Sequence, residues 1–207
     1  MAVPHSLPQR IFLLAYNPDK GRVGPGANLG AMLRAAALAD LYRGGHLTDE
    51  RGHAAIDVRR PCHDPVLDAL LEEIAGSKPH TWQSWIGHRQ RAAVRAVRQQ
   101  LDDDGWVHLQ PHKTLGLFHT TKVTIRDLRV RKELLGRVDT ALHEPISSID
   151  PADAALVAII AAGDLRLVLD RKTRRANKQR IQELTELSEP IGPALHKSIQ
   201  AAAVGEV

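Results

Sequence analysis

The sequence predicts a mainly α-helical fold, a single compact helical domain built around one hydrophobic core. Hydrophobic residues make up 43% of the chain and charged residues 25%, a balance typical of globular rather than disordered proteins. Aromatic residues account for only 3%, so the core must consist largely of Ala, Leu, Val and Ile, which pack well between helices. At 207 residues, one domain spanning 1–207 is the expected organisation.

Helical spacing of apolar residues, with matching start and stop signals, recurs along the first half of the chain. The pattern that begins at residue 28 ends at Gly44 and Gly45, which are typical of a helix C-terminus. Asp64 and Pro65 are the N-cap and first-turn residues expected at the start of a further helix. Helices are therefore expected over residues 28–42, 64–76, 81–87 and 89–103.

The second half contains the most apolar segment, residues 152–162, which follows Asp150 and Pro151 and ends at Gly163. Because this segment has no polar face, we expect it to be the central helix, surrounded on all sides. Further helices are expected over residues 127–143, 164–187 and 193–202.

Two small β-hairpins interrupt the helices. Residues 46–58 have Glu50, Arg51 and Gly52 at their middle, which predicts the first hairpin. Residues 106–109 and 114–118 are expected to pair across a turn at Gln110-Pro111-His112-Lys113, which gives the second.

The sequence favours a cytoplasmic protein whose contact with membranes is peripheral. Cys62 is the only cysteine, so no disulfide can form within the chain. The longest apolar stretch, 154–162, is far shorter than the roughly 20 residues needed to cross a bilayer. Residues 1–14 lack the cationic start and long apolar run of a secretory signal.

Motifs for catalysis or cofactor binding are weak. Gly24-Pro25-Gly26 has the wrong spacing for a dinucleotide-binding loop and is interpreted as a turn. Cys62-His63-Asp64, with His53 nearby, lacks the second close Cys or His pair of a zinc site, and Cys62 has no assignable partner as a nucleophile. Glu72-Glu73 is interpreted as a solvated helix face. We therefore expect no cofactor, no bound metal and no catalytic residue.

Positive charge concentrates between Glu73 and Asp102, where the sequence has no acidic residue. Arg91, Arg95 and Arg98 follow an i, i+4, i+7 spacing, which places them on one face of a helix. Guanidinium groups without partners repel one another, and an oxyanion with several acceptors relieves that repulsion. The alternative is a solvated face paired with carboxylates elsewhere. A second basic run, over 171–180, is expected to lie in water and to add only nonspecific attraction to an anionic membrane.

Several sequence blocks resemble the Golgi phosphoprotein 3 family (GPP34 domain). They are Leu33 to Leu41 running into Gly45-His46-Leu47; Trp85-Ile86 followed by Arg95 to Leu101 and Gly105-Trp106-Val107; and the apolar segment 154–161. Their order and spacing agree over about residues 9–187. The excess of arginine over lysine and the richness in alanine are typical of a GC-rich genome, which suggests a bacterial member.

The resemblance implies a site and a membrane-contacting element. Family members bind phosphatidylinositol 4-phosphate in a pocket made of a tryptophan and arginines; the arginines fall on Arg34, Arg95 and Arg98, with Arg91 as a neighbour, and the tryptophan position falls near Pro25. The family's protruding hairpin serves self-association and membrane contact. Its residues in this chain are Trp106, Leu115, Leu117 and Phe118.

We therefore expect a peripheral membrane adaptor that binds an anionic phospholipid headgroup at a membrane surface. Self-association into a homo-oligomer through the hairpin, and an unidentified protein cargo, are further implications of the resemblance. Two other functions stay open on the same arginines. One is nucleic-acid binding, disfavoured because few aromatic residues are available for stacking and no helix-turn-helix or RNA motif is found. The other is an enzyme that holds a phosphorylated substrate.

Overall fold

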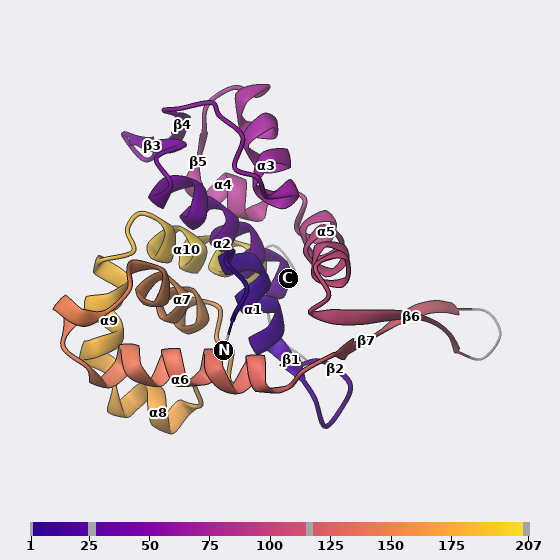
Figure 1. Ribbon diagram of the computed structural model, residues 1–207. Helices are drawn as coiled ribbons and strands as arrows, with labels where there is room; N and C mark the ends of the chain where they lie inside the picture. Colours follow the sequence, from indigo (N-terminus) through magenta and orange to yellow (C-terminus); the bar gives the residue numbers. More distant parts are fainter. Residues whose placement is uncertain (1, 25–27, 115–117, 205–207) are drawn as a thin grey trace.

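The computed structural model describes residues 2–24, 28–114 and 118–204, with side chains throughout these ranges except at 111–114 and 118–120. The predicted mainly helical fold is confirmed (Figure 1). The helices are α1 (Leu7–Ala15), α2 (Leu29–Arg43), α3 (Pro65–Ala75), α4 (Trp82–Gly87), α5 (Gln90–Asp103), α6 (Arg129–His143), α7 (Pro151–Ala162), α8 (Arg171–Ala176), α9 (Lys178–Glu186) and α10 (Ile191–Val204), with a 3-10 turn at Ile146–Ser148. The strands are β1 (Tyr16–Asn17), β2 (Arg22–Val23), β3 (Leu47–Glu50), β4 (His53–Ile56), β5 (His80–Thr81), β6 (Val107–Thr114) and β7 (Phe118–Ile125).

Helices α1, α2 and α7 form the centre of the molecule, and the other helices pack around them (Figure 1). Every residue of α7 from Ala152 to Ala161 is buried, which confirms the prediction of a central apolar helix. Alanines let these helices approach closely. At the end of α7, a Cβ on Gly163 would lie 2.4 Å from the sulfur of Met32 in α2, so a larger residue there would force the Met32 side chain to move.

The predicted helices of the first half begin and end close to where the sequence places them, but α1 was not predicted, because residues 10–15 show only a short apolar run. Asp64 caps α3, because its carboxylate accepts hydrogen bonds from the N–H groups of Val66 at 2.9 Å and Leu67 at 3.0 Å. The helix predicted over 164–187 is wrong in part. Asp164 has a left-handed backbone with φ of 52°, the chain turns until α8 begins, and Asn177 separates α8 from α9.

The first hairpin is confirmed as β3 and β4, which pair from Leu47 with Ile56 to Glu50 with His53. Two short strand pairings were not predicted: β5 adds to β4, and β1 pairs with β2. Both involve strands of two residues, which are too short to show an alternating pattern.

The second hairpin exists, but its predicted turn is wrong. Residues Gln110 to Lys113 lie inside β6 and pair with Lys122 to His119 of β7, and the second strand begins at Phe118. Proline is compatible with this position because both strands of a two-stranded ribbon are edge strands, with one side of each left unpaired. The ribbon projects away from the helices (Figure 1).

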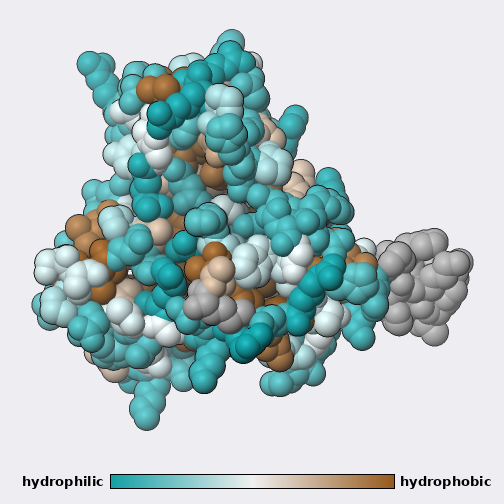
Figure 2. Space-filling view, in the orientation of Figure 1, coloured by the Kyte–Doolittle hydropathy of each residue, from teal (hydrophilic) through white to brown (hydrophobic). Residues whose placement is uncertain are grey.

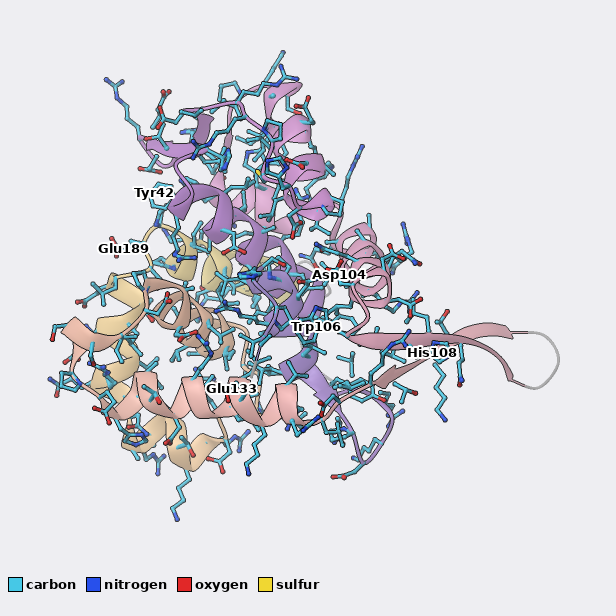
Figure 3. All side chains as sticks on the ribbon, in the orientation of Figure 1. Tyr42, Asp104, Trp106, His108, Glu133 and Glu189 are labelled. Atoms are coloured by element: carbon cyan, nitrogen blue, oxygen red, sulfur yellow. The ribbon has the colours of Figure 1, made fainter. Side chains whose placement is uncertain are left out.

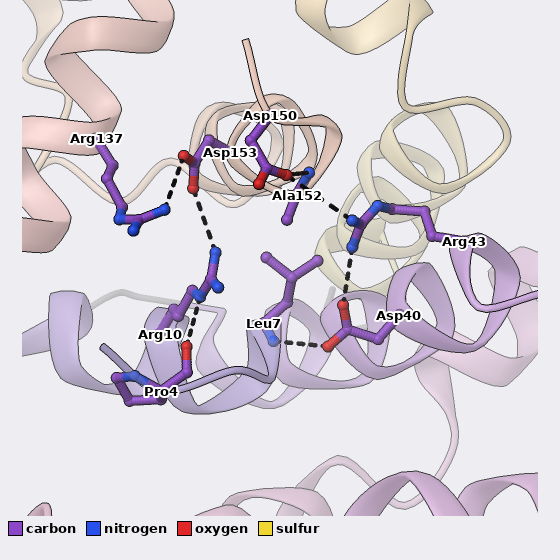
Figure 4. Close-up of polar contacts among 9 residues, drawn as sticks. All are labelled: Pro4, Leu7, Arg10, Asp40, Arg43, Arg137, Asp150, Ala152 and Asp153. Carbon is purple, nitrogen blue, oxygen red and sulfur yellow. Dashed lines mark hydrogen bonds and ion pairs between the residues drawn. The ribbon is translucent and has the colours of Figure 1, made fainter. Parts of the chain in front are cut away.

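A buried polar network joins α1, α6 and α7 (Figure 4). The Arg10 guanidinium donates to the carbonyl of Pro4 at 2.7 Å and to one carboxylate oxygen of Asp153 at 3.2 Å. Arg137 donates to the other carboxylate oxygen at 3.3 Å. Because Asp153 is shared by two arginines on different helices, its carboxylate links three elements of the core.

Asp40 lies at the edge of this network and makes stability depend on pH. Its carboxylate accepts hydrogen bonds from the Leu7 N–H at 2.6 Å and from Arg43 at 3.2 Å (Figure 4). Burial nevertheless raises the pKa of Asp40 from 3.8 to about 6, against the opposing effects of the Leu7 N–H and of the Arg43 and Arg10 charges. The folded protein therefore binds more protons than the unfolded chain between these two pKa values.

We expect the free energy of unfolding to fall, relative to an Asp40→Asn variant, as the pH rises through this window. The sign follows because ionisation is harder in the folded state, and the full effect above the folded pKa is roughly 3 kcal/mol. Urea denaturation of both proteins from about pH 4 to about pH 7 measures the difference, in which the shared contributions of other carboxylates cancel. If the difference in free energy of unfolding between the two proteins does not change with pH, the pKa of Asp40 is not raised above its ordinary value of 3.8.

Candidate anion-binding site

Helix α5 turns an arginine-rich face away from the core. Val97 and Leu101 are fully buried on one side of the helix. On another side Arg91 and Arg95 are exposed and Arg98 is half-buried. We call Arg91, Arg95 and Arg98 the α5 arginine face. The amphipathic pattern predicted for this segment is thus present in the structure, and the three guanidinium groups lie along the outer side of one helix.

No carboxylate forms an ion pair with the α5 arginine face among the residues that the structure describes. The acidic residues at the end of the same helix have other partners. Asp102 accepts a hydrogen bond from the Leu109 N–H at 3.1 Å, and Asp104 accepts one from the side chain of Gln9 at 2.6 Å. The face therefore carries positive charge without local neutralisation.

Arg34 has a different environment, because it is buried with only 5% of its surface exposed. Its Nε donates to the carbonyl of Trp85 at 3.0 Å, and its Nη1 donates to Glu73 at 3.1 Å. Its Nη2 is also buried and has no hydrogen-bond partner within the described part of the chain. Burial lowers the pKa of Arg34, while Glu73 acts in the opposite direction.

The Glu73 carboxylate contacts positively charged side chains from α2 and from the connection between α4 and α5. One carboxylate oxygen contacts Arg34; the other lies 2.9 Å from Nδ1 of His88 and 3.8 Å from Nε of Arg89. The Glu73 side chain is 16% exposed, whereas those of His88 and Arg89 are more than half exposed. Burial alone would raise the pKa of Glu73, but Arg34, His88 and Arg89 together hold it below its ordinary value.

A cavity of about 170 Å³ lies beside this cluster, between α2, α3 and α5. Arg34, Glu73 and Arg89 line it, and α5 contributes Ala92, Ala93 and Ala96 to its wall. The approach of α2 to α5 is close here: a Cβ on Gly30 would lie 2.6 Å from the Cβ of Gln90. Small residues on both helices thus leave a hollow beside the charged groups.

The structure brings Arg34 together with Arg89 and His88, while the α5 arginine face does not line the cavity. The α5 arginine face lies on a different side of α5 from the alanines that line the cavity. Sequence reasoning missed the contribution of His88 and the position of Glu73. The prediction that Glu72 and Glu73 form a solvated helix face holds only for Glu72, which is exposed and contacts exposed Arg59. No local sequence pattern distinguishes Glu72 from Glu73.

The β6–β7 ribbon continues directly from α5, and Trp106 stands at its base between Asp104 and His108 (Figure 3). Trp106 is half-buried and packs against the core, so the root of the ribbon is fixed to the helices. Leu115 and Leu117 lie outside the described residues, as does the side chain of Phe118. Hydrophobic residues on the face seen in Figure 2 form small separate patches among hydrophilic ones.

Burial raises the pKa of the Cys62 thiol to about 11, with Asp68 acting in the same direction. Cys62 is therefore a protonated thiol near neutral pH, which is the unreactive form. Among the described residues, no group of three or more His, Cys, Asp or Glu side chains is arranged to hold a metal ion. No helix in the described ranges has the length and apolar character needed to span a membrane.

Comparison with protein-family models matches residues 7–202 to Golgi phosphoprotein 3 (GPP34). No curated protein resembles the chain closely enough to count as a relative. Members of the family are known as phosphatidylinositol 4-phosphate-binding peripheral membrane proteins of the Golgi, and they are generally non-catalytic adaptors. Because the match covers nearly the whole chain, this protein belongs to the Golgi phosphoprotein 3 (GPP34) family.

Proposed function

We propose that this chain is a peripheral membrane adaptor that binds the phosphate of an anionic phospholipid headgroup at the α5 arginine face, Arg91, Arg95 and Arg98, while Arg34 lies in a separate buried cluster with Glu73. Phosphatidylinositol 4-phosphate is the leading candidate because the family is known for it. The chain would act from the cytoplasmic side, as a single domain of residues 1–207, without catalysis.

The α5 arginine face is the observation that carries this proposal. Its guanidinium groups are planar, permanently charged donors that suit phosphate oxygens. They have no carboxylate partners among the described residues, and they follow one another along the outside of a rigid helix. A lipid phosphate supplies the acceptors that the protein does not provide.

The position of the ribbon supports membrane contact. Because β6 begins where α5 ends, a surface that meets the arginine face also lies close to the root of the ribbon (Figure 1). Lys122 of β7 is exposed and adds positive charge there.

We expect an Arg95→Ala/Arg98→Ala double variant to bind anionic liposomes roughly 30-fold more weakly than the wild type, since each arginine near an anionic surface contributes about 1 kcal/mol. Flotation with liposomes containing phosphatidylinositol 4-phosphate, phosphatidylserine or phosphatidylcholine alone measures the partition coefficient. A specific headgroup site predicts tighter binding to the phosphoinositide than to phosphatidylserine at matched surface charge.

An Arg171→Ala/Arg175→Ala variant is the matched control, because it removes the same net charge from exposed positions on α8. It should retain most of the binding. Equal capture of the wild type and the Arg95→Ala/Arg98→Ala variant would overturn the proposal. If both double variants lose liposome binding equally, the binding reflects attraction by overall charge and not a specific headgroup site.

A further inference from the structure

Glu73 occupies the position that an external anion would take in the cluster around Arg34. Its carboxylate lies against Arg34 on one oxygen and against His88 and Arg89 on the other. These cations come from α2 and from the connection between α4 and α5, while Glu73 comes from α3. Groups from separate elements therefore converge on a single carboxylate, as they would on a bound phosphate.

Glu73 does not satisfy this cluster fully. Two arginines face one carboxylate, which leaves an excess positive charge even with His88 neutral. The Arg34 side chain is only 7% exposed, and its Nη2 has no acceptor within the described residues. A buried guanidinium N–H without a partner is unfavourable, so an additional acceptor oxygen at this point would stabilise the cluster.

A cavity lies beside this cluster. The cavity that Arg34, Glu73 and Arg89 line has a volume of about 170 Å³. That is several times the roughly 30 Å³ that a water molecule occupies in the liquid. The side chains of His88 and Arg89 are more than half exposed, so they can move without disturbing the core.

We propose that Glu73 is an intramolecular competitor that closes an anion site formed by Arg34, His88 and Arg89, and that phosphate groups bind this site when the carboxylate is displaced. The proposal rests on the proposed function in one respect: the natural phosphate would be that of a lipid headgroup drawn in by the α5 arginine face. Glu73 then sets a threshold, because only a ligand with more negative charge than one carboxylate competes well with it.

Glu73→Gln tests this directly, since glutamine keeps the size of the side chain and removes its charge. We expect the variant to bind inorganic phosphate about tenfold more tightly than the wild type, because the competing charge-assisted hydrogen bonds are lost. Isothermal titration calorimetry gives the dissociation constants. The increase in melting temperature with phosphate concentration should likewise be larger for the variant, since binding to the native state stabilises it.

Glu72→Gln is the matched control, because it removes the same charge one residue away from a carboxylate that contacts Arg59 instead of the cluster. It should leave phosphate binding unchanged. Adding Arg89→Ala to Glu73→Gln should abolish the gain. If Glu73→Gln is too unstable to purify, Glu73→Asp replaces it, because aspartate keeps the charge but moves the carboxylate away from the cluster. Its affinity for phosphate should increase less than that of Glu73→Gln.

Unchanged phosphate affinity in folded Glu73→Gln, or equal gains in Glu72→Gln and Glu73→Gln, would overturn the inference and leave Glu73 as a structural ion-pair partner. The proposed function fails separately, when liposome binding does not depend on Arg95 and Arg98. Phosphate binding by Glu73→Gln without liposome binding by either protein would point to a free phosphate-bearing ligand instead of a lipid.

Discussion

Asp153→Ala is expected to lower the free energy of unfolding by about 3–5 kcal/mol, because it leaves buried arginine charge without a counter-ion. The side chains of Asp153 and Arg10 are only 11% and 9% exposed. Such a loss is a large fraction of the 5–15 kcal/mol that typically separates folded from unfolded proteins. The variant should therefore unfold at a markedly lower denaturant concentration and temperature than the wild type.

The same site also predicts which substitution is tolerated. Burial raises the pKa of Asp153 even though Arg137 and Arg10 oppose the change, and burial lowers the pKa of Arg10 despite Asp153. Desolvation thus outweighs attraction for both partners. Removing both charges, as in Arg10→Met/Asp153→Leu, should consequently be less destabilising than Asp153→Ala alone.

Guanidinium chloride denaturation followed by circular dichroism measures these changes. Asp139→Ala is a control on α6, since its carboxylate is 78% exposed and its loss should alter stability by less than about 0.5 kcal/mol. A loss below about 1 kcal/mol for Asp153→Ala would contradict the buried network, because that is the size expected of an exposed ion pair.

Phe12→Ala should be comparably destabilising, by about 3–5 kcal/mol, because it empties a large space in a closely packed core. Phe12 is 1% exposed on α1 and is among the largest fully buried side chains of the described residues. Helix α1 packs against α2, α5, α6 and α7, so the cavity would lie where these helices meet. The neighbouring backbone has little freedom to collapse into it.

Thermal and chemical denaturation of Phe12→Ala, Phe12→Leu and Leu128→Ala would measure this effect. Leucine restores most of the volume and should reduce the loss substantially. Leu128 is 54% exposed, so its truncation should change stability by no more than about 0.5 kcal/mol. Equal stabilities of the three variants would show that packing at Phe12 contributes little.

The two predicted hairpins show where local sequence information is sufficient and where it is not. The first contains Glu50-Arg51-Gly52, and Gly52 has a positive φ of 85°, which glycine adopts readily. Its turn therefore has a chemical signature. The second has a proline inside a strand, so the strongest local turn signal, at Pro111, is misleading. A two-stranded ribbon tolerates this proline, because each strand has one unpaired edge. Only the pairing register of the structure shows that Pro111 lies within a strand and not in the turn.

By itself, the sequence determined the helical class, the caps and the central position of α7, because these depend on apolar periodicity and on contacts between residues close in the chain. It also identified the α5 arginine face, since spacing along one helix fixes which side chains share a side. The tertiary structure alone decided that Glu73 faces Arg34, and that Arg89 and His88 share that carboxylate. These residues come from different elements, and their meeting depends on how α2, α3 and α5 pack, which no local pattern encodes.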